Sequence, residues 1–210
     1  ILAILINEIR GRRAKKFFQT VVTFPHFISW VVLGGILTSM FSSSGIINQV
    51  LGAIGLPSVS PLTSVDSFRP FIWISNIWKE IGWDSIIYIA AITSIDTGLY
   101  EAAEVDGANR LQKMWHITLP GSRSTIVIML ILAVGQVMNN GRFDQIFNLY
   151  SAPVYSVGDT LDTYIFRESF VTGGLNFGYS TAIGLFKSVI GVVLISISNK
   201  IASRADEGLF

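Results

Sequence analysis

The chain has 210 residues and a formal net charge of +1; 50% of the residues are hydrophobic, 14% are charged and none is cysteine. Soluble globular domains carry about 25% charged residues, so this composition argues against a soluble domain or a nucleic-acid-binding protein and favours a protein of the lipid bilayer. The lack of cysteine excludes a disulfide framework, a thiolate metal site and a cysteine nucleophile.

The first residues, ILAILI, are apolar and follow neither a Met nor a basic segment. A secretory signal would carry a charged start and a small-residue cleavage site, and neither is visible. We therefore expect a single transmembrane domain over 1–210 that begins inside a span, with one or more upstream spans missing.

Four apolar segments follow this start, at 21–41, 71–95, 125–137 and 179–197. A helix needs about 20 apolar residues to cross the hydrocarbon, and backbone amides in lipid must be paired internally. The sequence therefore predicts an all-α membrane protein with these segments as its spans.

Basic residues predict the orientation of these spans. Three regions that alternate crossings place on one side hold ten of the fifteen Lys and Arg residues: Arg10, Arg12, Arg13, Lys15, Lys16, Arg110, Lys113, Arg123, Lys200 and Arg204. The positive-inside rule makes that side cytoplasmic. The loops 42–70 and 138–178 then face outwards, with a short interfacial helix expected at 46–54 and a helix at 159–171 capped by Asp159 or Thr160.

A polar, helix-forming stretch, EAAEVDGANRLQKMWHITLP, joins the second and third segments at 101–120. Ala102 and Ala103 allow close approach of a partner, and Gly107 allows the chain to bend between two helical arms. An apolar stripe follows at helical spacing, inside a rim of charges: the stripe is Ala108, Leu111, Met114 and Trp115, and the charges are Glu101, Glu104, Asp106, Arg110 and Lys113. The plain alternative is a solvated connector.

The spacing of this stretch is Glu-Ala-Ala, three residues, Gly107, nine residues, Ile117, any residue, Leu119 and Pro120. It resembles the EAA loop of binding-protein-dependent ABC importer permeases. FPHFISWVV, WKEIGW, YIAAITSID, HITLPG, DTYIFR and GLFKSVIG resemble the sugar and oligosaccharide branch, in which an alginate-type oligosaccharide importer is one candidate.

The resemblance implies a type I ABC importer transmembrane domain, a helical bundle with a cytoplasmic coupling helix, in the bacterial inner membrane. It implies a heterodimer with a second permease, two cytoplasmic ATPase subunits that bind ATP and Mg, and an extracytoplasmic solute-binding protein; this chain would bind no cofactor. Within the loop 96–120, the expected ATPase-coupling residues are Glu101, Ala102, Ala103, Asp106, Gly107, Arg110, Leu111, Met114 and Trp115.

Polar residues near membrane depth leave alternatives open. Lys79, Glu80 and Asp84 either lie at the outer interface, or belong to an outer gate or to a helix kink at Gly82. In the first case Lys79 would snorkel, and Trp78 and Trp83 would form an aromatic belt. Lys187 is either paired with an internal carboxylate or carbonyl, or a cavity lysine that attracts solute. A second group either caps the outer end of the third segment or joins Lys187 in a substrate path: Gln136, Asn139, Asn140 and Arg142.

The sequence indicates no metal-binding, nucleotide-binding or catalytic site within the chain itself. His26 and His116 are far apart and lack a carboxylate cluster, so we expect no metal site. There is no phosphate-binding loop with a lysine and no nucleophile–base pair, so we expect no catalytic residue. The rivals to an importer permease are an ion-coupled secondary transporter of a small polar solute, a membrane-embedded enzyme and a membrane scaffold.

Overall fold

A computed structural model of the chain describes residues 1–9, 11–137, 142–171 and 177–203. Helices joined by short turns make up this part of the chain, and it contains no β-strand. The all-helical fold predicted from the sequence is therefore confirmed. Four residues used in the sequence predictions lie outside the described residues: Arg10, Asn139, Asn140 and Arg204.

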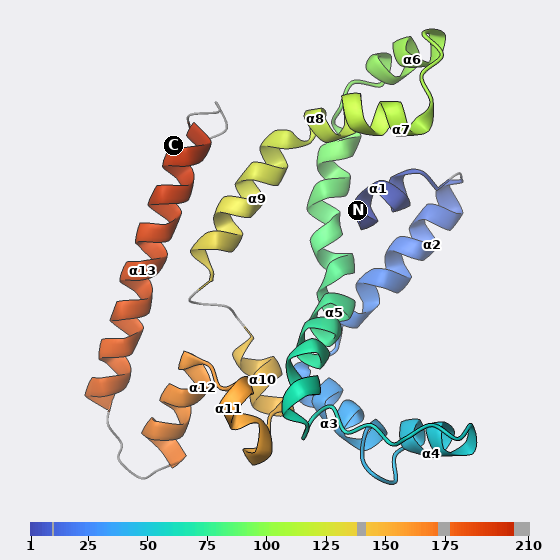
Figure 1. Cartoon of the computed structure of the whole chain (residues 1–210). Helices are drawn as coiled ribbons and strands as arrows, with labels where there is room; N and C mark the ends of the chain where they lie inside the picture. The colour runs from blue at the N-terminus through green and yellow to red at the C-terminus, as the bar shows by residue number, and fades with distance from the viewer. Residues whose placement is uncertain (10, 138–141, 172–176, 204–210) are drawn as a thin grey trace. The chain divides into compact units, whose positions relative to one another are not determined.

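The chain, whose helices are labelled in Figure 1, divides into two compact units. The division cuts the two longest helices, α5 (Val65–Thr93) and α13 (Phe177–Ser203), and the short helix η1 (Phe24–Phe27). Unit 1 comprises Ile1–Pro25, Glu80–Asn139 and Ser188–Phe210, and unit 2 comprises His26–Lys79 and Asn140–Lys187. The expectation of a single domain over 1–210 stays a prediction.

Unit 1 packs its N-terminal helices against the second half of α5. Ala3, Ile6, Ile89 and Ile92 form its buried cluster. At Gly82 a Cβ atom would lie 2.0 Å from the carbonyl oxygen of Val22, so glycine is needed for this approach. The helices that lie wholly in this unit are α1 (Leu2–Asn7), α2 (Arg12–Thr23), α6 (Thr97–Val105), α7 (Arg110–Lys113), η2 (Met114–Thr118), α8 (Leu119–Gly121) and α9 (Arg123–Gly135).

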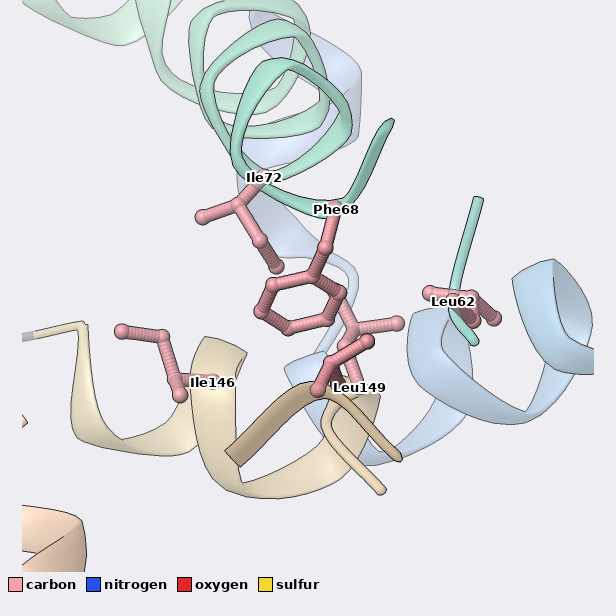
Figure 2. Close-up of a cluster of buried hydrophobic side chains, with 6 residues drawn as sticks. Leu62, Phe68, Ile72, Ile146 and Leu149 are labelled. Carbon is pink, nitrogen blue, oxygen red and sulfur yellow. The ribbon is translucent and has the colours of Figure 1, made fainter. Parts of the chain in front are cut away.

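Unit 2 has its own apolar core, which Figure 2 shows around the first half of α5. Phe68 and Ile72 from α5 meet Ile146 and Leu149 from α10 (Phe143–Leu149), and the cluster is completed by Leu62 and Val154. The other helices that lie wholly in this unit are α3 (Trp30–Met40), α4 (Ile46–Ala53), η3 (Ala152–Val154), α11 (Tyr155–Gly158), α12 (Leu161–Phe166) and η4 (Arg167–Val171).

The first apolar segment is not one continuous helix, so the prediction of an unbroken span over 21–41 is wrong. The helix α2, which begins before this segment, ends where η1 starts, and Pro25 in η1 has no amide hydrogen to donate. A new helix begins after Ser29, whose hydroxyl accepts from the amide of Val32 at 3.3 Å. Together the two helical pieces are apolar enough for one span, so the segment is either a broken span or a re-entrant loop.

Among the described helices, α13 alone is long and apolar enough to cross a bilayer, and up to three spans result if each bent helix pair counts as one. The second bent pair, Arg110–Gly121 with Arg123–Gly135, meets at 60°. The helix α5 has the length at 29 residues but carries charges that include Lys79, Glu80 and Asp84.

Two of the smaller expectations are confirmed. The short helix predicted at 46–54 is α4, and Thr160 caps α12 by accepting from the amide of Thr163 at 3.3 Å.

Candidate functional site

The first arm of the 96–120 stretch is the helix α6. Its N-terminus is fixed by Asp96, whose carboxylate accepts from the amide of Gly98 at 3.0 Å. A short polar side chain at this position satisfies amides that the helix leaves unpaired. The arm therefore begins at a defined residue immediately after the end of α5.

Gly107 ends this first arm in a left-handed conformation, with φ of +76°. The amide of Ala108 donates to the carbonyl of Ala103 at 2.8 Å, and the amide of Gly107 donates to that of Glu104 at 3.1 Å. This pair of bonds is the Schellman arrangement, which favours glycine at the left-handed position. The bend predicted at Gly107 is confirmed, and it is a helix stop rather than a flexible joint.

The second arm starts two residues later with a reciprocal cap. The side chain of Asn109 accepts from the amide of Gln112 at 2.9 Å, and the side chain of Gln112 accepts from the amide of Asn109 at 2.7 Å. The helix runs through α7, widens to a π-helical turn at η2 and continues as α8. Sequence reasoning missed the π-helical turn, which often marks a functional position.

Two polar contacts join the arms into a hairpin. Lys113 donates to the carboxylate of Glu104 at 2.5 Å, and the hydroxyls of Tyr100 and Thr118 lie 2.9 Å apart. The hydrogen bond and the charge of Lys113 hold the pKa of Glu104 below its ordinary value. Of the charged rim expected from the sequence, this is the pair that forms within the hairpin; Arg110 instead lies 3.9 Å from Glu8.

The hairpin presents apolar side chains to its surroundings. Trp115 is 63% exposed and Leu111 is similarly exposed, whereas Met114 is half-buried. A hollow of about 290 Å³ lies between the arms, lined by Ala103, Ala108, Gln112, Lys113, His116 and Ile117. Glu101, Ala102, Asp106 and Arg110 are exposed on the same hairpin. The structure therefore brings together on one hairpin all the residues predicted to couple to an ATPase.

Only some of the residues predicted for the substrate path lie in the described part of the chain. Gln136 is exposed at the end of α9 in unit 1, and Arg142 is half-buried before α10 in unit 2. Asn139 and Asn140 lie outside the described residues. The assignment of these residues to a substrate path stays a prediction.

Lys187 forms an ion pair with Asp162 of α12. The lysine side chain is 6% exposed and the aspartate side chain 35% exposed. This is the first of the two interpretations of Lys187, a lysine paired with an internal carboxylate. A direct role with solute stays a prediction.

Lys79 is buried, so the expectation that it snorkels to an interface is wrong. Its ammonium donates to the main-chain carbonyl of His26 at 2.8 Å and lies 5.4 Å from the centre of the Trp30 ring. Both partners flank the break between η1 and α3, where carbonyl groups lack helical donors. Trp78 and Trp83 are exposed, as an aromatic belt requires.

Residues 1–207 match the family described as the binding-protein-dependent transport system inner membrane component. The chain belongs to this family. Two curated relatives of Bacillus subtilis (strain 168) match the whole chain: protein LplB at 43% identity and the polygalacturonan/rhamnogalacturonan transport system permease protein YteP at 40%. The chain spans 66% and 65% of their respective lengths.

Solved structures confirm the type I ABC importer transmembrane fold. A bacterial ABC transporter involved in the import of the acidic polysaccharide alginate matches with a TM-score of 0.90 and 41% identity, over 97% of this chain and 70% of that chain. A bacterial alginate ABC transporter in complex with an alginate pentasaccharide-bound periplasmic protein matches with a TM-score of 0.91 and 40% identity, over 99% of this chain and 71% of that chain.

Proposed function

We propose that this chain is the membrane-spanning permease subunit of an ATP-driven importer and forms half of the translocation path for a sugar or oligosaccharide. Membership of the transport family and the curated permease YteP support this proposal. The observation that carries it is the hairpin 97–121, whose exposed Leu111 and Trp115 lie beside small and charged side chains. Such a surface suits a protein partner in water, because large apolar anchors surrounded by polar groups are typical of interfaces.

The partners in this proposal are a second permease, two cytoplasmic ATPase subunits and an extracytoplasmic solute-binding protein. The ATPases would hold ATP and Mg, and this chain would carry out no covalent chemistry. Among the described residues, no group of three His, Asp or Glu side chains is placed to hold a metal ion; that this permease needs none stays part of the proposal. The hairpin and the C-terminus would face the cytoplasm, where their Lys and Arg residues belong by the positive-inside rule.

The mechanism is conformational. Closure of the ATPases would displace the hairpin, and its second arm passes through η2 and α8 to the bent junction with α9. Because the contact of Tyr100 with Thr118 and the ion pair between Glu104 and Lys113 hold the arms together, the hairpin would move as one piece. Movement of one packed helical element against another is a known route between inward- and outward-facing states.

Oligosaccharides from acidic polysaccharides are the first substrates to test. YteP is named for polygalacturonan and rhamnogalacturonan transport, and the matching solved transporter imports alginate. These proteins are 40% and 41% identical to this chain.

The test is uptake by the complete complex reconstituted in proteoliposomes with the solute-binding protein. We expect oligosaccharide uptake with ATP and Mg inside, and none when a non-hydrolysable analogue replaces ATP. An imposed ion gradient without ATP should give no uptake. Uptake driven by the ion gradient alone would contradict the proposal and favour a secondary transporter.

A further inference from the structure

A long part of the chain around α3 and α4 carries no formal charge. From Phe17 to Val65 there is no Asp, Glu, Lys or Arg. Loops that face water are normally rich in charged and polar residues, so an uncharged loop between two helices needs another explanation. The short helix α4 lies in the middle of this stretch.

One face of α4 is an exposed apolar stripe. Ile46, Val50 and Ile54 follow one another at intervals of four residues and are 61%, 55% and 64% exposed. Residues four apart lie on the same face of a helix. Leu56, which follows the helix, is exposed as well, and together these four side chains form what we call the α4 stripe.

The opposite face of α4 is fixed to the protein by Asn48, which is buried. Its amide group donates to the carbonyls of Ser42 at 2.9 Å and Val59 at 3.0 Å, and its oxygen accepts from the amide of Val59 at 2.8 Å. Gly45 fits tightly against α3, since a Cβ there would lie 2.3 Å from the carbonyl oxygen of Met40. The stripe therefore lies on the face of α4 that is turned away from these hydrogen bonds.

The attachment also keeps α4 close to the end of α3, as Figure 1 shows. Five residues separate the two helices, which limits their separation along the chain to about 20 Å. The helix α3 belongs to a bent pair apolar enough to cross a bilayer, and its own Val31 and Val32 are exposed. The α4 stripe thus lies close, along the chain, to the end of a helix that is part of a candidate span.

We propose that the α4 stripe is embedded in the boundary between lipid headgroups and acyl chains, on the side of the membrane at which α3 ends. Apolar faces of short helices bind this boundary by burying side chains about 5–10 Å deep. The lipid surface is favoured over a protein partner because the stretch offers no charge to complement one, and because five residues separate α4 from the end of α3, which is part of a candidate span. This proposal rests on membership of a membrane-protein family rather than on the transported solute.

The experiment uses the absence of cysteine from the chain. Val50→Cys and Ile54→Cys are spin-labelled in the assembled transporter, with partner cysteines replaced, in nanodiscs of phosphatidylcholine. The matched control is Gln49→Cys, an exposed polar position on the flank of the same helix. Collision rates are measured with oxygen, which concentrates in lipid, and with a water-soluble nickel chelate.

We expect the oxygen-to-nickel collision ratio to be severalfold higher at Val50 and Ile54 than at Gln49. Ratios equal to the control would show that the stripe faces water and would overturn the proposal. Labels that are immobilised and protected from both reagents would show a protein partner on the stripe and would also overturn it. Because the substituted side chains are exposed, retained ATPase activity of the labelled complex verifies that it is assembled.

Discussion

The ammonium of Lys113 lies 2.5 Å from the carboxylate of Glu104, across the turn at Gly107. Glu104 belongs to the first arm of the hairpin and Lys113 to the second, so the pair joins segments that the chain separates by nine residues. Glu104 is largely exposed and Lys113 is half-buried. The pair therefore orients the arms without being sealed from water.

This pair makes the hairpin sensitive to acid. The pKa of Glu104 lies below its ordinary value because Lys113 donates a hydrogen bond and supplies positive charge. A lowered pKa in the folded state stabilises the hairpin above the ordinary pKa of the carboxyl group, and that stabilisation is lost as pH falls through the lowered value. Hydrogen exchange of amides 99–116, corrected for intrinsic rates, should show this loss. Glu104→Gln should abolish the pH dependence, whereas Glu101→Gln should retain it.

Gly107→Ala should loosen the hairpin. A Cβ at this position meets no atom within 4 Å, so the cost is backbone strain alone, about 1–2 kcal/mol for a left-handed residue with a side chain. Gly107→Asn should cost less, since asparagine tolerates this conformation. Gly35→Ala is the control, because Gly35 lies within α3 with equal space and no positive φ. Amide exchange in the hairpin measures the difference, and equal rates in all three variants would contradict the stated role of Gly107.

Gly107→Asp and Ala103→Arg should go further and uncouple transport. The first places a negative charge at the C-terminal end of α6, where the helix dipole disfavours it, and the second places a long charged side chain in the hollow between the arms. We expect both variants to insert in the membrane and to lose ATP-dependent uptake. Normal uptake by both would count against the coupling role of the hairpin.

Trp115→Ala should weaken the binding of the ATPase subunits. Loss of a central aromatic anchor costs about 2 kcal/mol or more, which corresponds to an affinity about 30-fold weaker. The control is Trp78→Ala, which removes the same side chain from an exposed position on α5. The dissociation constant is measured between permeases in nanodiscs and the free ATPase, and an unchanged constant for Trp115→Ala would place the interface elsewhere.

The ion pair of Asp162 and Lys187 predicts an asymmetric response to substitution. Asp162→Asn leaves a nearly buried lysine without its counter-charge, and we expect this to lower the free energy of unfolding by about 3–5 kcal/mol. Lys187→Met leaves only an aspartate that is 35% exposed on its side chain, so it should cost less. Thermal unfolding in detergent compares the two variants with the double variant Asp162→Leu/Lys187→Met, which should recover stability. If Lys187 bound solute directly, Lys187→Met would raise the KM for uptake without lowering stability.

Sequence reasoning succeeded where one local pattern decides the structure. Helix-forming residues before Gly107, the polar cap at Thr160 and the apolar period of α4 each specify their own element. The same patterns predicted which residues the hairpin 97–121 brings together, because all of them lie within a single turn-and-helix stretch.

Sequence reasoning failed where residues that are distant in the sequence determine the local structure. The break at η1 needs Pro25 but is completed by Lys79, which lies 53 positions away from its carbonyl partner. Hydropathy alone showed an unbroken apolar run there. The partner of Lys187 was likewise not predictable, because Asp162 is 25 positions earlier in a segment expected to face outwards. The π-helical turns at η2 and η4 have no known short-range signal in the sequence.

The pairing of Lys187 with Asp162 has a consequence for biogenesis. Since α12 precedes α13 in the chain, the carboxylate leaves the ribosome before the ammonium does. A lone lysine would oppose partitioning of its helix into lipid. Because α12 is synthesised first, Asp162 would already be present to neutralise Lys187 when α13 enters the lipid.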